Sequence, residues 1–214
     1  MNDGFISLVS IWCLLIIIWS GWFDSFFQGN RHKRMLCMIP LVLWLLGHGW
    51  KYPFSYGEIW VLPVLLPIVV ATYVWVKEGE NNRLHIVTAS FLVGVSVFFM
   101  QMLFHLDPVL MFMDEKLLLA GFTVLLIMMT ARRLSHQWIL FSFALGLSDL
   151  CFQLYVWQKS GFFSLGNPFI QDIWWMTVTL LFLTRSILYL VKRPIIVKRK
   201  RVEATGIARI EEIK

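Results

Sequence analysis

The sequence predicts an all-α integral membrane protein, a seven-helix transmembrane bundle with its N-terminus outside and its C-terminus in the cytoplasm. Three observations lead to this fold class. Hydrophobic residues make up 58% of the 214 residues and charged residues only 15%, against about a quarter in soluble domains. The apolar residues gather into runs that approach or reach the roughly 20 residues needed to cross a bilayer. Short basic segments separate these runs, so the net charge of +6 indicates topology and not nucleic-acid binding.

Seven apolar runs are assigned as crossings, and together they form a transmembrane domain over residues 1–191. Their approximate bounds are 5–27, 35–50, 58–76, 84–106, 117–130, 135–157 and 169–191. Residues 192–214 form a basic cytoplasmic tail. The first run is not expected to be a cleaved signal peptide, because its leader has no basic residue and no small-x-small cleavage site follows.

The distribution of basic residues sets the orientation. Of the 19 lysines and arginines, fifteen then lie on the cytoplasmic side, three on the outer side and one, Arg185, within a crossing. This bias is the one expected for cytoplasmic loops. Six crossings with a re-entrant fifth run remain an alternative, which would place Arg132 and Arg133 or the basic tail outside.

The segments between the crossings are expected to be loops or short interfacial pieces. Residues 51–57 and 161–168 are predicted outer loops, and the Met-rich residues 109–113 are predicted to be interfacial or re-entrant. The third run carries Pro63 and Pro67, which remove two backbone donors and bend the helix. Such a bend serves either a cavity or gate, or merely packing.

The sixth run carries one face of small and polar side chains, spaced by four, three and four residues: Ser142, Gly146, Asp149 and Gln153. These positions share one side of a helix. Small residues allow another helix to approach closely, and an acid in hydrocarbon needs a partner. We therefore expect Asp149 to be buried and to face the fourth crossing, within reach of Gln101 or His105.

If the second, fourth and sixth crossings are neighbours, their polar residues would line one outward-facing vestibule: His48, Gln101, His105, Asp149 and Gln153. Intramembrane ionisable residues suggest a solute, proton or ion site. The alternative is that they hydrogen-bond neighbouring helices and hold the bundle together. A zinc site of two histidines and Asp149 is a third interpretation, which no H-x-x-x-H spacing supports.

The fourth and sixth crossings also resemble each other. Residues 90–96 parallel residues 142–148 at an offset of 52 residues, and Gln101 then aligns with Gln153. A parallel repeat of two-helix units would explain the likeness, and so would chance among apolar segments.

No catalytic motif, metal-binding cluster or cofactor motif is present in the sequence, so no enzyme, metal or cofactor is expected. The three cysteines lie inside apolar runs, where they are typical packing residues. Partners are expected to be the lipid bilayer and a membrane protein. The basic cluster of the tail is expected to attract anionic lipid at about 1 kcal/mol per residue: Lys198, Arg199, Lys200 and Arg201.

A resemblance to a known family rests on a short motif and on the layout of the chain. The motif is His105-Leu106-Asp107-Pro108-Val109, followed by Met111-Phe112 and Asp114, among crossings rich in Trp and Phe. The chain resembles the YphA-like family of uncharacterised multi-pass membrane proteins from spore-forming Gram-positive bacteria. The resemblance implies a bacterial cytoplasmic-membrane location, and it implies no activity and no functional residues.

Two functions therefore remain from the sequence. The first is a non-catalytic membrane protein that acts through membrane or protein partners, because catalytic motifs and a large soluble domain are both absent. The second is a small-solute or proton-coupled transporter, which the polar residues, the bent third crossing and the repeat would support.

Overall fold

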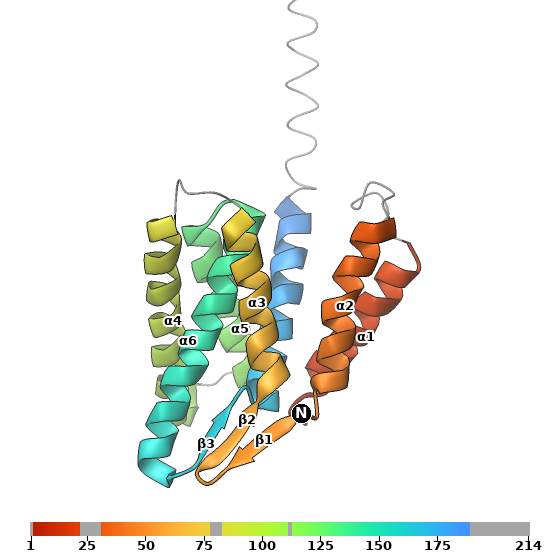
Figure 1. Ribbon diagram of the computed structural model, residues 1–214. Coiled ribbons are helices and arrows are strands. Elements are labelled where there is room, and N and C mark those ends of the chain that lie inside the picture. Colours follow the sequence, from red (N-terminus) through yellow and green to blue (C-terminus); the bar gives the residue numbers. More distant parts are fainter. Residues whose placement is uncertain (1, 22–30, 78–82, 111–112, 189–214) are drawn as a thin grey trace, which may run out of the picture. The chain divides into compact units, whose positions relative to one another are not determined.

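The computed structural model describes residues 2–21, 31–77, 83–110 and 113–188. The chain divides into two compact units, Met1–Thr177 and Val178–Lys214, and every contact discussed below lies within the first. Its helices and strands are shown in Figure 1. The helices are α1 (Phe5–Trp19), α2 (Arg31–Gly47), α3 (Val61–Lys77), α4 (Arg83–Leu106), α5 (Glu115–Thr130) and α6 (Leu134–Ser160), with a 3₁₀ turn, η1, at Pro108–Leu110. Residues 168–188 are also helical.

The helices occupy the apolar runs that the sequence predicts, and their ends differ in places. Helix α1 ends at Trp19, and residues 22–27 of the first predicted run lie outside the described residues. Among the described helices, α4 and α6 are each long and apolar enough to cross a membrane, whereas α1, α3 and residues 38–47 of α2 are shorter apolar helices. Part of the predicted Met-rich segment belongs to η1, and residues 111–112 lie outside the described part.

The structure is otherwise helical, but a small three-stranded sheet occupies the two segments predicted to be outer loops. Strands β1 (Lys51–Phe54) and β2 (Gly57–Trp60) form an antiparallel hairpin, and β3 (Phe163–Leu165) pairs parallel with β2. Aromatic and β-branched residues here favour extended backbone. A Cβ at Gly57 would collide with the Phe163 carbonyl oxygen, so glycine lets the two strands pair closely. Figure 1 shows the sheet at one end of α3 and α6.

Only one of the two prolines in α3 interrupts helical hydrogen bonding, which corrects the expectation of two lost donors. Pro63 lies in the first turn of α3, which begins at Val61, and an N–H at that position has no acceptor within the helix. Pro67 lies inside the helix, where it removes a backbone hydrogen bond. Both proline side chains are buried.

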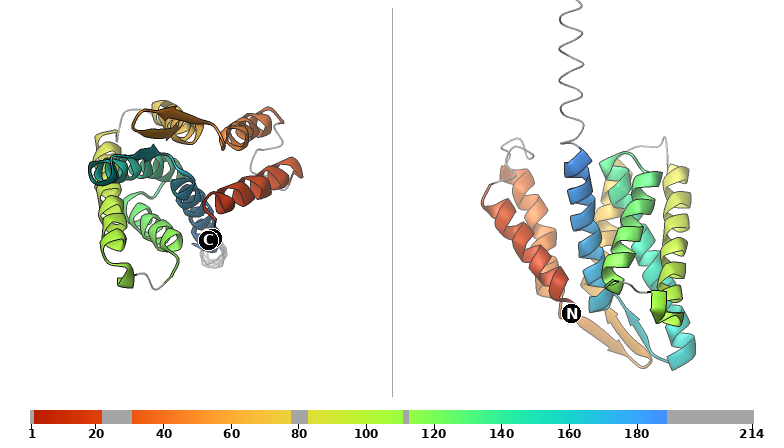
Figure 2. Two further views of the ribbon diagram at one scale, coloured as in Figure 1. Left: turned by 90° about the horizontal axis from the view of Figure 1, so that it is seen from below. Right: turned by 180° about the vertical axis from the view of Figure 1, so that it is seen from behind.

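Among the labelled helices α1 to α6, α4 and α6 form the most extensive contact, and Figure 2 shows them side by side in both views. Gly94 makes this contact close, because a Cβ there would lie 2.9 Å from the Ala144 carbonyl oxygen and 3.0 Å from the Leu147 side chain. Gly146 does not serve this purpose, since a Cβ there would meet nothing within 4 Å. The close approach predicted for the face of α6 that carries Gly146 therefore occurs on the neighbouring face, which carries Ala144 and Leu147. Gly94 and Gly146, which align at the 52-residue offset, thus have different surroundings.

We predict that Gly94→Leu lowers the free energy of unfolding by about 1–3 kcal/mol, because overpacking forces two backbones apart. Titration with a denaturing detergent would measure the change. Gly121→Leu is the matched control, since Gly121 also lies within a helix but a Cβ there meets nothing within 4 Å. Equal stability of the two variants would contradict the close contact at Gly94.

Candidate functional site

Two polar side chains of α6 bind the backbone of β3 and the residue after it. Asp149 Oδ2 accepts a hydrogen bond from the Gly166 N–H at 2.8 Å, and Gln153 Oε1 accepts one from the Ser164 N–H at 3.2 Å. Alternate amides along an extended strand point to the same side, so these two N–H groups face away from β2. Four residues of helix span about 6 Å and two residues of strand about 6.6 Å. The distance between Asp149 and Gln153 along α6 therefore matches the distance between the Ser164 and Gly166 N–H groups, which do not bond to β2.

The same network continues through Gln171 to His48, which directly follows α2. Gln171 Nε2 donates to the Gly166 carbonyl oxygen at 3.0 Å, and its Oε1 lies 2.8 Å from His48 Nδ1. Gly166 has a φ of 70°, a left-handed conformation that favours glycine. Its N–H and C=O groups are thus both bound by side chains, and this one turn links Asp149 of α6 with Gln171 and, through it, with His48.

A second buried carboxylate, Asp172, holds the beginning of α1. Asp172 is fully buried; its Oδ2 accepts from the Gly4 N–H at 2.9 Å, and its Oδ1 accepts from the Ser7 N–H at 2.8 Å. The first N–H groups of a helix lack acceptors within it, and the N-terminal end of a helix attracts negative charge. Asp172 therefore caps α1 from another helix. Gly4 permits this approach, because its φ is 88° and a Cβ there would meet the His48 ring at 3.1 Å.

Lys116 balances the charge of Asp172. Its Nζ lies 2.7 Å from Asp172 Oδ2 and 2.8 Å from Asp3 Oδ1, and its side chain is 5% exposed. The Nζ also lies 5.6 Å from the centre of the Phe169 ring, within cation–π range. Burial alone would lower the pKa of Lys116, but hydrogen bonds with Asp172 and Asp3 outweigh it and raise that pKa. The ammonium group thus remains charged at neutral pH and compensates the buried carboxylate.

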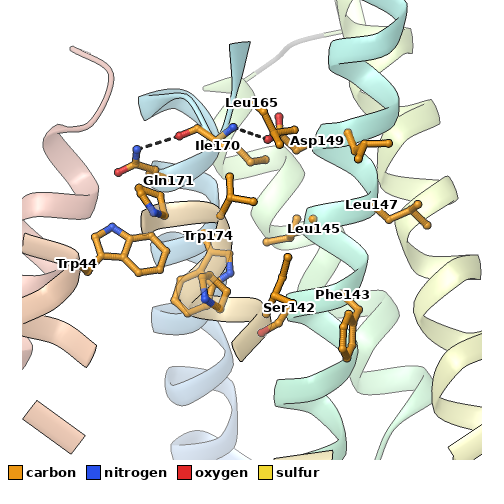
Figure 3. Close-up of a pocket in the computed structure, with 17 residues that line it drawn as sticks. Trp44, Ser142, Phe143, Leu145, Leu147, Asp149, Leu165, Ile170, Gln171 and Trp174 are labelled. Carbon is orange, nitrogen blue, oxygen red and sulfur yellow. Dashed lines mark hydrogen bonds between the residues drawn. The ribbon is translucent and has the colours of Figure 1, made fainter. Parts of the chain in front are cut away.

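A pocket of about 300 Å³ lies beside this network, between α2, α3, α6 and the beginning of the 168–188 helix (Figure 3). Its walls are largely apolar and include both prolines of α3. Its polar lining residues are Ser142, Asp149, Gln171, Trp44 and Trp174. Trp44 and Trp174 belong to an aromatic cluster, with ring centroids 5.0 Å apart.

The structure brings together three of the five residues predicted to line a vestibule. His48, Asp149 and Gln153 join one network through residues 164–166 and Gln171. Gln101 and His105 lie apart from it: Gln101 is buried on α4, and His105 is exposed, with its ring 5.9 Å from that of Phe152. The predicted burial of Asp149 is confirmed, at 4% exposure, but its predicted partner is wrong, because its carboxylate binds Gly166 and not the fourth crossing.

Sequence reasoning missed Asp172, Lys116 and Gln171. Asp172 is the single acidic residue between positions 169 and 191, the same signal that drew attention to Asp149. Lys116 is one of the three basic residues assigned to the outer side from the sequence, and its position beside an apolar run does not indicate an acidic partner. The predicted lipid-binding cluster, Lys198, Arg199, Lys200 and Arg201, lies outside the described residues.

The chemistry of this region is that of structural hydrogen bonding. Among the described residues, no group of three or more His, Cys, Asp or Glu side chains is placed to hold a metal ion. The carboxylates of Asp149 and Asp172 each accept backbone N–H groups, and the amide of Gln171 is bound at both its oxygen and its nitrogen.

Comparison with protein families gives a match over most of the chain. A family model described as YphA-like integral membrane protein matches residues 3–204. No curated protein and no solved structure matches the chain.

We predict that Asp172→Leu lowers the free energy of unfolding by about 3–5 kcal/mol, because the buried Lys116 then keeps only the largely exposed Asp3 as an acidic partner. Adding Lys116→Met should recover part of the loss, since neither of the two buried charges then remains. Detergent-titration unfolding of the single and double variants would measure both effects. Glu58→Gln is the control, because it breaks the exposed Lys51–Glu58 pair, which should contribute at most about 1 kcal/mol. A loss from Asp172→Leu no larger than the control's would contradict this role.

We predict that Asp149→Asn keeps most of the stability, because the amide oxygen can still accept from Gly166. Asp149→Leu removes the acceptor and should lower the free energy of unfolding by about 1–3 kcal/mol. The same unfolding titration compares the two variants. Equal losses would show that the hydrogen bond to Gly166 is not what Asp149 contributes.

Proposed function

The chain belongs to the YphA-like integral membrane protein family, and from this premise we propose that it is a non-catalytic, multi-pass protein of the bacterial cytoplasmic membrane. It acts through membrane or protein partners and performs no reaction of its own. This proposal rests on which groups the buried polar side chains bind. The carboxylates of Asp149 and Asp172 hold the turn after β3 and the start of α1, which is a scaffolding role.

The arrangement of charges supports seven crossings with the N-terminus outside. Helix α3 runs away from the sheet and ends at Lys77, and α6 runs toward the sheet and begins just after Arg132 and Arg133. These cations therefore belong to the end opposite the sheet, as the positive-inside rule requires of the cytoplasmic side. In this proposal the sheet faces outward, and the basic residues 198–201 contact anionic lipid at the inner surface.

A small-solute or proton-coupled transporter is the second candidate, and one observation favours it. The pocket beside Asp149 adjoins Pro67, where α3 lacks a backbone hydrogen bond. Broken or bent helices and an acidic residue commonly form the binding sites of transporters.

The proposed topology predicts where a reporter that is active only in the cytoplasm will function. Fusions after Lys214 or within residues 31–34 should be active, and an insertion within residues 161–168 should be inactive. Reporter activity at 161–168 would contradict the outward position of the sheet and with it the seven crossings.

The two candidate functions differ in what the isolated protein does. We expect the full chain, purified in a mild detergent, to retain a defined membrane protein at fixed stoichiometry, and in liposomes alone to move neither protons nor small solutes. Asp149→Asn serves as the matched variant, because it should preserve the fold. Proton or solute flux by the wild type that Asp149→Asn abolishes would instead establish the transporter.

A further inference from the structure

The buried carboxylates of Asp149 and Asp172 differ in how their charge is compensated. Asp172 Oδ2 lies 2.7 Å from the Nζ atom of Lys116, which is itself buried. The hydrogen-bonding neighbours of the Asp149 carboxylate are the Gly166 N–H group and the Gln153 side chain, and among the described residues no cation contacts it. Buried charges in proteins are otherwise paired, above all in a membrane. Asp149 therefore offers a negative charge that a bound cation would compensate.

Asp149 lines the pocket described above, and this pocket opens toward the side of the helices. Gly146 and Leu150 also line it and are exposed, and a Cβ at Gly146 would meet nothing within 4 Å. Gly146 precedes Asp149 by about one turn of α6, and Leu150 directly follows it, so the opening lies next to Asp149. Gly146 is about 18 Å from the start of α6, in the middle part of a helix long enough to cross a membrane. A ligand would therefore reach Asp149 from the bilayer.

The other walls of the pocket suit an apolar body attached to the cation. Val64 and Ile68 of α3 and Phe143 of α6 line it, and Figure 3 shows Asp149 near one end of the lining residues and Phe143 near the other. These two residues are about 9 Å apart along α6, and the volume of about 300 Å³ is that of a site for a small molecule.

The nature of the polar partner excludes a bare metal ion. Metal ions such as Ca²⁺ and Mg²⁺ need several oxygen ligands, and within the described ranges no three His, Cys, Asp or Glu side chains are placed to hold one. A carboxylate forms strong hydrogen bonds with charged N–H donors. An ammonium group on an apolar chain therefore matches both Asp149 and the apolar walls.

We propose that this pocket binds a small primary amine with an apolar chain, in its ammonium form, which enters from the bilayer between α3 and α6. The ammonium group donates a hydrogen bond to the Asp149 carboxylate and compensates its charge. The apolar chain lies between Gly146 and the side chains of α3. This inference goes beyond the proposed function, because a protein that acts through partners needs no such ligand, and binding of the amine requires no transport.

Competitive photolabelling of the full chain in nanodiscs tests the proposal. The probe is decylamine with a diazirine in its alkyl chain, and labelled peptides are mapped by mass spectrometry. We expect labelling of residues 61–68 and 142–150 that excess decylamine suppresses. Decanol has the same chain without the charge and, at equal concentration in the bilayer, should compete about ten- to hundredfold less well, the effect of losing a hydrogen bond between charged groups. Labelling that neither compound suppresses, or that both suppress equally, would overturn the proposal.

Two variants with matched controls locate the site. Asp149→Asn removes the charge but keeps an acceptor for Gly166, so the protein should fold while the labelling that decylamine suppresses falls about ten- to hundredfold. Glu58→Gln should have no effect, because it removes a carboxylate that does not line the pocket. Gly146→Leu fills the opening and should abolish this labelling, whereas Gly121→Leu, on α5, should leave it unchanged. Unchanged labelling in Asp149→Asn or in Gly146→Leu, or an equal loss in Glu58→Gln, would overturn the proposal.

Discussion

Two buried carboxylates, which accept hydrogen bonds from backbone N–H groups, hold the described structure together at the end where the three-stranded sheet lies. In apolar surroundings an unpaired N–H group costs free energy comparable to a lost hydrogen bond. Asp172 supplies the acceptors that the first turn of α1 lacks, and Asp149 supplies one to the turn after β3. Lys116 then neutralises the carboxylate that is buried most completely. The packing of α1 and the position of β3 both depend on these bonds.

The pocket differs from this network in one physical respect. Within the network, the polar groups of Asp172, Gln171 and Gly166 have partners: backbone groups, Lys116 and His48. At the pocket, the hydroxyl of Ser142 and the indole N–H groups of two tryptophans have no such partner among the described residues. Partnered and unpartnered polar groups therefore lie side by side on the stripe of α6 that begins at Ser142 and ends at Gln153.

The sequence predicts the positions of the helices well, but it predicts poorly which elements each helix packs against. Apolar runs locate α4 and α6 because hydropathy is a local property, and the spacing on α6 correctly predicts a buried Asp149. The spacing does not identify the neighbour that this face contacts, so Gly94 and not Gly146 makes the close approach to another helix. Strands of three or four residues are too short for a clear alternation, and the aromatic residues of β1 are equally typical of a membrane interface. Asp172, like Asp149, is the single acidic residue of an apolar run, but its hydrogen-bond partners lie more than fifty residues away in the sequence.

Hydrogen–deuterium exchange of the Gly4, Ser7 and Gly166 amides tests the central role of the carboxylates most directly. The Gly4 and Ser7 amides have no acceptor within α1, and the Gly166 amide lies in a turn, so none is protected by helical bonding alone. If Asp172 and Asp149 hold them, all three should exchange as slowly as amides in the middle of α6 when the protein is in nanodiscs. Exchange at the rate of an open terminus or loop at these three amides would contradict the account.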